Sequence, residues 1–209
     1  MLTSFLAQHE DTSQTEVSIS RITRDKYDRL LQENGYQRKT IVFDVALDGS
    51  QDIPAFQWTK SDEFSQSKEY LDWLKLHVQL PEDMQYYPSF ADPDLLTTSC
   101  ASAQYLLKGT IDVAVVSKIY VDSWNTPSGI RVAIELKKNA APEHVMQAVT
   151  QLLSATAKSN FKVVVLLTDL KDHFQFFWLH QNYIVDCKYL WQGCALAAPK
   201  LAVHDVFLV

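Results

Sequence analysis

Two short apolar segments, and the helical segment that follows them, set the strongest limit on how this chain can fold. The segments GTIDVAVVSK, from Gly109, and IRVAIELKK, from Ile130, both alternate at the two-residue period of a β-strand. The alternation places Asp112 on the face opposite the apolar residues of the first strand, and Glu135 and Lys137 opposite those of the second. The intervening SWNTPSG is rich in turn formers, so we expect an antiparallel hairpin.

The polar residues of this hairpin have a chemical use. Asp112 and Glu135 can supply carboxylate oxygens to a hard cation such as Mg2+ or Mn2+, with the backbone carbonyl of Leu136 and waters completing the octahedron. Lys137 can orient or polarise an attacking water or a scissile phosphate. Charges in apolar strands are costly unless they are paired or metal-bound, which favours such a site, although Glu-x-Lys alone is common on solvated strand faces.

Length and composition narrow the classes of protein that remain. The 209 residues, 47% of them hydrophobic, predict about one domain with an appended lobe. A formal net charge of −6 argues against a generally basic nucleic-acid binder, but it allows an enzyme with a local basic groove. Three cysteines match neither a disulfide framework nor a zinc site, so we expect free thiols in a reducing, intracellular compartment. No run reaches the roughly 18 apolar residues of a membrane span, so no membrane partner is expected.

Basic residues gather in the sequence around the predicted site, whereas acidic residues dominate elsewhere. They are Lys118, Arg131, Lys137, Lys138, Lys158 and Lys162. This asymmetry is typical of a groove that faces phosphate, although an ordinary solvated rim is an alternative explanation.

Before the hairpin region, the pattern predicts a polar start, one short helix and one strand. Residues 1–20 are rich in Ser and Thr and are expected to be frayed. A helix from Ile22 should end at Gly35, because glycine commonly stops helices at their C-termini. The alternating, β-branched segment TIVFDVAL, from Thr40, predicts a strand.

The next part of the chain contains one helical segment and two less regular ones. Residues 61–78 predict an amphipathic helix with Ser61 as its N-cap and an apolar stripe that starts at Phe64. The prolines, adjacent tyrosines and acids of residues 81–93 are typical of a loop. The following LLTTSCASAQYLLKG is compatible with a strand or with a short helix.

After the hairpin, the pattern predicts one helix and several strands. The helix should run from about Pro142 to Lys158. The almost wholly apolar FKVVVLLTDL is typical of a strand covered on both faces. HFQFFWLHQ, after the turn DLKDH, and NYIVDCKYLW alternate enough to be strands, and the final LAVHDVFLV fits a strand or a helix. No linker interrupts the chain, so we expect the N-terminal third to pack on the rest as one body.

The order of these segments resembles a known family. GTIDVAVV, IELKK and QAVTQLL resemble the catalytic core of the PD-(D/E)xK nuclease superfamily. The longer series, which continues to VVVLLTDLKDHFQFFWL, is similar to the C-terminal nuclease-like domains of Crinkler-type effectors of oomycetes and fungi, over about half the chain, from Leu107 to His180. The resemblance implies an α/β fold whose mixed β-sheet has a restriction-endonuclease-like αβββαβ core. Residues 1–60 would form an N-terminal α+β addition packed on a nuclease-like domain of residues 61–209.

The resemblance also implies roles for the hairpin residues. Asp112 and Glu135 would bind Mg2+, or Mn2+, and Lys137 would assist the nucleophile. Gln147 and Gln151, four residues apart on one helix face, resemble the glutamines that touch metal-bound water or phosphate in related nucleases. Two solvated glutamines are the alternative interpretation.

Many members of the superfamily carry a further glutamate on the helix before the aspartate strand. In this chain Glu69 is the best candidate for this metal ligand and Glu63 is the second. If neither reaches the site, the metal has only two protein carboxylates.

We therefore expect a metal-dependent nuclease that hydrolyses phosphodiester bonds, with DNA a more probable substrate than RNA by family likeness. It would act as an effector in the nucleus or cytoplasm of a host cell. The main alternative is a catalytically inactive nuclease fold that binds a host protein or chromatin. A third alternative is a partner-binding module that works through the N-terminal third, with an exposed apolar patch there.

Other candidate sites have simpler explanations. Cys100 and His144 could form part of a thiol protease, but nothing in the sequence fixes their geometry. Phe176, Trp178 and Tyr183 are more typical of a core than of a platform for base stacking.

Overall fold

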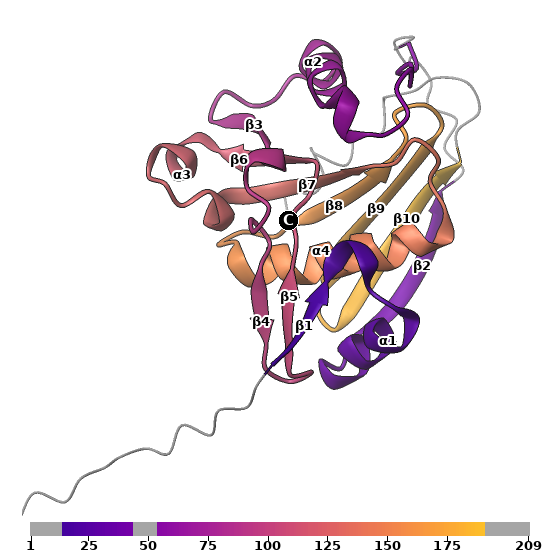
Figure 1. Cartoon of the computed structure of the whole chain (residues 1–209), viewed down its shortest axis with the longest axis vertical. Helices are drawn as coiled ribbons and strands as arrows, with labels where there is room; N and C mark the ends of the chain where they lie inside the picture. The colour runs from indigo at the N-terminus through magenta and orange to yellow at the C-terminus, as the bar shows by residue number, and fades with distance from the viewer. Residues whose placement is uncertain (1–13, 44–53, 191–209) are drawn as a thin grey trace, which may run out of the picture.

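The computed structural model describes residues 14–43 and 54–190 and shows a mixed α/β protein (Figure 1). The described residues contain four α-helices and two mixed β-sheets, one of seven strands and one of three. The predicted α/β class with a mixed sheet is therefore confirmed.

The larger sheet has the strand order β2-β10-β9-β8-β7-β6-β3. Its strands are β2 (Gln37–Phe43), β3 (Met84–Pro88), β6 (Val113–Ser117), β7 (Ile130–Leu136), β8 (Val164–Thr168), β9 (His173–His180) and β10 (Tyr183–Leu190). Strands β6 and β7 are antiparallel, as their sequences predict, whereas β7 and β8 are parallel. Parallel neighbours need a long crossover, and helix α4 (Pro142–Lys158) supplies it.

Both faces of the larger sheet are covered, as the alternation along β7 shows. Ala133 belongs to the core that includes α4, whereas Val132 and Ile134 belong to the core that includes α2 (Ser67–His77). Successive side chains of a strand point to opposite faces, so Glu135 shares the face of Ala133 and points toward α4. Glu135, one of the two acids of the predicted site, therefore lies between the sheet and α4.

The smaller sheet, in the order β1-β5-β4, joins the N-terminal segment to the middle of the chain. It consists of β1 (Thr15–Ser18), β4 (Thr98–Cys100) and β5 (Tyr105–Lys108). The prediction that residues 1–20 are frayed is wrong for β1, because this strand pairs in parallel with the distant β5. The undecided segment before the hairpin region forms the antiparallel pair of β4 and β5.

Most of the regular elements that the sequence predicted are confirmed. Helix α1 (Arg24–Glu33) ends just before Gly35, whose φ of +68° is the left-handed conformation that glycine tolerates best. Helix α4 has the predicted bounds, and β8 is buried along its whole length. Strands β9 and β10 pair antiparallel. The final segment, residues 201–209, lies outside the described residues.

The predicted helix of residues 61–78 is shorter than expected. A 3-10 turn starts at Phe64, and α2 begins only at Ser67. Asp62, rather than Ser61, caps this region, because its Oδ1 accepts a backbone hydrogen bond of 2.8 Å from the following turn. Phe64 is thus out of phase with the buried helix face and is 68% exposed.

Two predicted loops contain regular structure. Residues 81–93 include the strand β3, which pairs antiparallel with β6 and ends at Pro88, an acceptable position for proline on an edge strand. The connection between β6 and β7 is helix α3 (Lys118–Asp122) followed by a 3-10 turn (Thr126–Gly129) rather than a simple turn. Strands β6 and β7 still pair antiparallel, with a register shift between Val115 and Val116.

Candidate active site

The predicted acids and lysine meet at one end of the β6–β7 pair. Asp112 lies directly before β6, Glu135 lies near the end of β7, and Lys137 follows that end. The Oδ2 atom of Asp112 accepts a hydrogen bond of 2.7 Å from the backbone N–H of Leu136. This bond holds the Asp112 carboxylate at the end of β7, close enough to Glu135 for the two charges to interact.

Glu135 is the centre of the cluster and is only 3% exposed. Its Oε1 accepts hydrogen bonds from Lys137 Nζ at 2.6 Å and from Gln147 Nε2 at 2.5 Å. Its Oε2 accepts one from Gln151 Nε2, also at 2.5 Å. Three side-chain donors therefore orient the carboxylate, and one of them carries the compensating positive charge.

The two glutamines reach Glu135 because they project from α4 toward the sheet. Gln147 is 8% exposed and Gln151 is fully buried, so they are not the solvated pair that was the alternative interpretation. Gln151 Nε2 also donates to the backbone carbonyl of Thr110 at 3.1 Å, which ties α4 to the segment before β6. A spacing of four residues puts both amides on one helix face.

The structure favours Glu63 over Glu69 as the additional acid of the site. Glu63 is partly buried, and its Oε1 accepts a hydrogen bond of 3.0 Å from the backbone N–H of Lys138, next to Lys137. Glu69 is exposed on α2, where the neighbour it influences electrostatically is Lys68. The shorter helix explains the difference, because the 3-10 turn before α2 carries Glu63 toward the end of β7.

Burial and neighbouring charge shift the pKa values of the cluster. Burial, together with the negative charge of Glu135, raises the pKa of Asp112 well above its ordinary value. Burial acts to lower the pKa of Lys137, but the carboxylates of Glu135 and Asp112 outweigh it, so the pKa rises and the ammonium stays charged. Burial and the charge of Lys137 lower the pKa of His144.

These properties partly fit a divalent cation. The Oδ1 atom of Asp112 makes no hydrogen bond within the described residues, and burial and the charge of Glu135 raise the pKa of this carboxyl more than the nearby Lys137 lowers it. Oε1 of Glu135 already accepts two bonds, whereas Oε2 accepts only the bond from Gln151, so Oε2 keeps a lone pair that a cation could use. Across residues 14–43 and 54–190, no group of three or more His, Cys, Asp or Glu side chains is placed to hold a metal. A cation would therefore depend on Asp112, Glu135, the carbonyl of Leu136 and water.

The basic residues that cluster in the sequence are dispersed in space. Lys118 and Arg131 lie at the far ends of β6 and β7, where Lys118 binds the carbonyl of Glu82 and Arg131 lies over the ring of Phe161. Lys158 donates to the carbonyl of Thr97 at 2.9 Å. Near the acidic cluster, Lys137 is accompanied by Lys138. Lys118, Arg131 and Lys158 therefore do not line a basic groove at the acidic cluster.

The other candidate residues that the sequence offered do not form a catalytic or base-stacking site. Cys100 has Asn34 and Ser102 as its hydrogen-bond partners, whereas His144 caps α4 by accepting a 2.9 Å bond from the backbone N–H of Ala141. Cys100 and His144 therefore do not form a catalytic pair. Phe176 lies in the core beneath α2 and the partly buried Trp178 packs against it, as predicted, but the prediction is wrong for Tyr183, which is 37% exposed.

An exposed aromatic pair beside the cluster was not predicted as a site. The rings of Phe64 and Phe90, which are 68% and 45% exposed, lie 6.2 Å apart and nearly perpendicular. Phe64 follows Glu63 directly, and Phe90 follows Ser89, whose backbone N–H donates to the carbonyl of Asp112 at 3.3 Å. Sequence analysis did not single out this pair, because Phe64 also fits the apolar stripe of the helix predicted for residues 61–78.

Comparison with known proteins found a partial similarity to a Crinkler effector protein. The chain is 28% identical over 109 residues to Crinkler effector protein 2 of Phytophthora infestans, a match that covers 51% of this chain and 24% of that protein. The match thus spans only about a quarter of this relative's length. It supports the Crinkler likeness that the sequence predicted. No protein-family model matches the chain, and no solved structure matches it. None of the described helices is long and apolar enough to cross a membrane.

Proposed function

We propose that this chain is a divalent-metal-dependent nuclease with a restriction-endonuclease-like core, which hydrolyses phosphodiester bonds of nucleic acid, DNA in preference to RNA. One observation carries the proposal: Asp112, Glu135 and Lys137 come together at one end of β6 and β7 beneath two glutamines of α4. The raised pKa of Asp112 supports it, because a bound cation would offset the burial and the repulsion from Glu135 that disfavour the ionised carboxylate.

Each residue of the cluster has a role in this proposal. Asp112 and Glu135, together with the carbonyl of Leu136, would hold Mg2+ or Mn2+, and a bound ion would supply Lewis-acid polarisation of a phosphoryl oxygen. Lys137 orients the attacking water and stabilises negative charge on the phosphate. Gln147 and Gln151 keep the Glu135 carboxylate in position.

The similarity to a protein named as an effector supports an effector role, and we propose that this role is exercised in the nucleus or cytoplasm of a host cell. A second function, binding of a host protein or chromatin without cleavage, is favoured by the three side-chain donors that already hold the Glu135 carboxylate. In that case the cluster is a buried ion pair that stabilises the fold.

A cleavage assay separates the two functions. We expect the purified protein to cleave single-stranded or duplex DNA with Mg2+ or Mn2+, and EDTA to stop the reaction. The double variant Glu135→Ala, Lys137→Ala should lower the rate by about 10²- to 10⁴-fold, because it removes one metal ligand and the charge that orients water. The pair Lys68→Ala, Asp72→Ala, which breaks an exposed ion pair on α2, is the matched control and should cleave normally. Absence of cleavage by the folded wild type with either metal would favour the binding function.

We expect Phe64 and Phe90 to contact bases of single-stranded substrate. Stacking of a base on an aromatic ring contributes about 1–3 kcal/mol, so the variant Phe64→Ala, Phe90→Ala should bind an oligothymidylate about 5- to 100-fold more weakly. Fluorescence anisotropy in EDTA measures this binding without cleavage. Trp124→Ala, which removes a 95% exposed ring at the far end of β6 and β7, should leave affinity unchanged. An equal loss in both variants would contradict a specific stacking role.

A further inference from the structure

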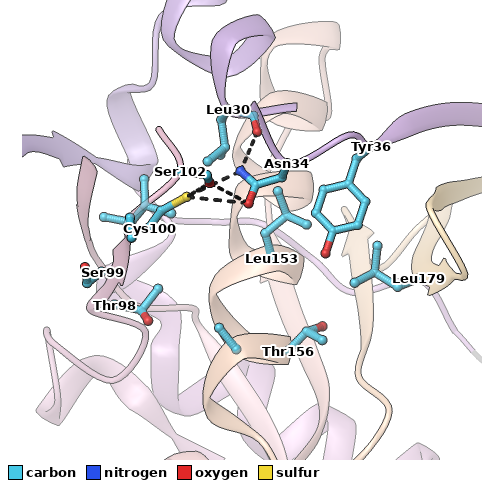
Figure 2. A pocket seen from close by; sticks show the side chains of 13 residues that line it. Leu30, Asn34, Tyr36, Thr98, Ser99, Cys100, Ser102, Leu153, Thr156 and Leu179 are labelled. Carbon is cyan, nitrogen blue, oxygen red and sulfur yellow. Dashed lines mark hydrogen bonds between the residues drawn. The ribbon is translucent and has the colours of Figure 1, made fainter. Parts of the chain in front are cut away.

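His144 lies in the first turn of α4 and shares a helix face with the two glutamines of the acidic cluster. Gln147 follows it by three residues and Gln151 by seven, and this spacing places the three side chains along one stripe of the helix. Both glutamines donate to the Glu135 carboxylate. His144 therefore lies one turn nearer the start of the helix, whereas the surface hollow that Leu153 lines is at the other end of α4 (Figure 2).

The charges of the acidic cluster act on His144, which places its ring beside the cluster. Burial, the largest influence, lowers the pKa of His144, and the charge of Lys137 lowers it further. The carboxylates of Glu143, Glu135 and Glu63 act in the opposite direction but do not outweigh these two. The imidazole is therefore mainly neutral at pH 7. Its side chain is only partly buried, so solvent and substrate can reach it.

One hydrogen bond fixes which ring nitrogen of His144 carries the proton. The backbone N–H of Ala141 donates to Nδ1 at 2.9 Å, so Nδ1 must present its lone pair. A neutral imidazole then has its proton on Nε2. Nε2 lies on the other side of the ring and makes no hydrogen bond within the described residues. The ring thus offers one N–H donor beside Lys137.

This arrangement suits a hydrogen-bond donor rather than an acid or a base. Protonation of Nδ1 would break the Ala141 bond that caps α4, and the protonated Nε2 has no lone pair with which to accept a proton. A non-bridging phosphate oxygen is a strong acceptor for such an N–H group. We propose, on the basis of the nuclease function, that His144 Nε2–H donates to a non-bridging oxygen of the phosphate that Lys137 faces. Lys137 supplies charge and His144 supplies a directed hydrogen bond.

Nitrogen NMR of the 15N-labelled chain tests both the proton position and the contact. We expect the proton of His144 on Nε2 in the free protein. A DNA oligonucleotide added in EDTA should shift the Nε2 resonance, because a hydrogen bond to phosphate forms. The control is His180, which is exposed at the end of β9 away from Glu135 and should not shift. A proton on Nδ1, or an unshifted His144 Nε2 in the presence of bound DNA, overturns the proposal.

The variant His144→Asn separates the phosphate contact from the capping of α4. Its shorter amide can still accept the Ala141 bond through Oδ1 but cannot reach the position of Nε2, so the Tm should change by less than about 2 °C. We expect kcat/KM for DNA cleavage to fall about 10- to 100-fold, as the loss of one charge-assisted hydrogen bond predicts. His180→Asn is the matched control and should cleave normally.

The outcomes distinguish this contact from the nuclease activity itself. A wild-type kcat/KM in His144→Asn, or an equal loss in both variants, would overturn the contact and leave the nuclease function standing. A wild type that does not cleave, but whose His144 Nε2 shifts on DNA binding, would contradict the nuclease function and support the contact. A wild type that neither binds nor cleaves DNA would overturn both.

Discussion

Replacement of Asp112 by asparagine is expected to stabilise the metal-free protein and to abolish its proposed activity. The pKa of Asp112 is raised by burial and by Glu135, which means that the ionised carboxylate is unfavourable in the folded state. Asparagine removes the charge and keeps an oxygen that can accept the hydrogen bond from Leu136 N–H. We expect a gain of about 1–3 kcal/mol in the free energy of unfolding, or roughly 2–10 °C in Tm.

The pH dependence of this gain has a definite sign. In the unfolded chain an aspartate has a pKa of about 4, whereas the folded value of Asp112 lies above it. The folded wild type therefore binds the proton more tightly, and its stability falls as the pH rises from about 4 through the raised folded pKa. Asp112→Asn lacks this fall. Its advantage should be absent below about pH 4 and should grow as the pH increases.

Thermal unfolding in EDTA across this pH range measures the effect. Added Mg2+ or Mn2+ should raise the Tm of the wild type and leave that of Asp112→Asn unchanged, because binding to the folded state stabilises it by mass action. A variant that is less stable than the wild type at neutral pH would contradict the expected repulsion. Metal-dependent cleavage should fall at least about a hundredfold in the same variant, because a metal ligand is lost.

The second large effect is expected from Lys137→Met, which keeps most of the aliphatic length of the side chain and removes its charge. Glu135 would then remain buried beside Asp112 without a compensating cation. Removal of one member of a buried ion pair is strongly destabilising, so we expect a loss of about 2–4 kcal/mol in the free energy of unfolding at pH 7. Urea denaturation in EDTA provides the measurement.

An exposed pair of the same length provides the control. Lys68 and Asp72 on α2 are also 2.6 Å apart, but their side chains are 84% and 55% exposed. Lys68→Met should cost less than about 1 kcal/mol, since water screens this pair. Similar losses in Lys68→Met and Lys137→Met would show that the burial of Glu135 does not set the strength of its ion pair.

The elements that were predicted well from the sequence have local signals. The helix of α4 begins at Pro142, α1 stops before Gly35, and the alternation of residues in β6 and β7 marks two strands. Each signal comes from residues a few positions apart, and these residues keep their spacing in any fold. The period of two also predicts that Glu135 lies on the opposite face of the strand from Ile134 and Leu136, and both of these residues belong to the core on the α2 side of the sheet.

The elements that were missed depend on distant partners. The strand β1 is only four residues long and exists through its pairing with β5, and β3 lies in a proline-containing segment that pairs with β6. Short edge strands have little local pattern, because their hydrogen bonds are made with residues far along the chain. Likewise, the chain between β6 and β7 had turn-forming residues but forms a short helix as well.

Strand periodicity and turn-forming residues are local signals, so the sequence alone was enough to place Asp112, Glu135 and Lys137 in or directly beside two neighbouring strands. The residues that join them are set by the packing of the helices on the sheet. This packing brought Glu63 rather than Glu69 to the cluster, and it buried Gln147 and Gln151 against Glu135. The physical reason is that helix phase, burial and the distance between charges depend on how α2 and α4 pack on the sheet, and that packing is absent from any short segment of the chain.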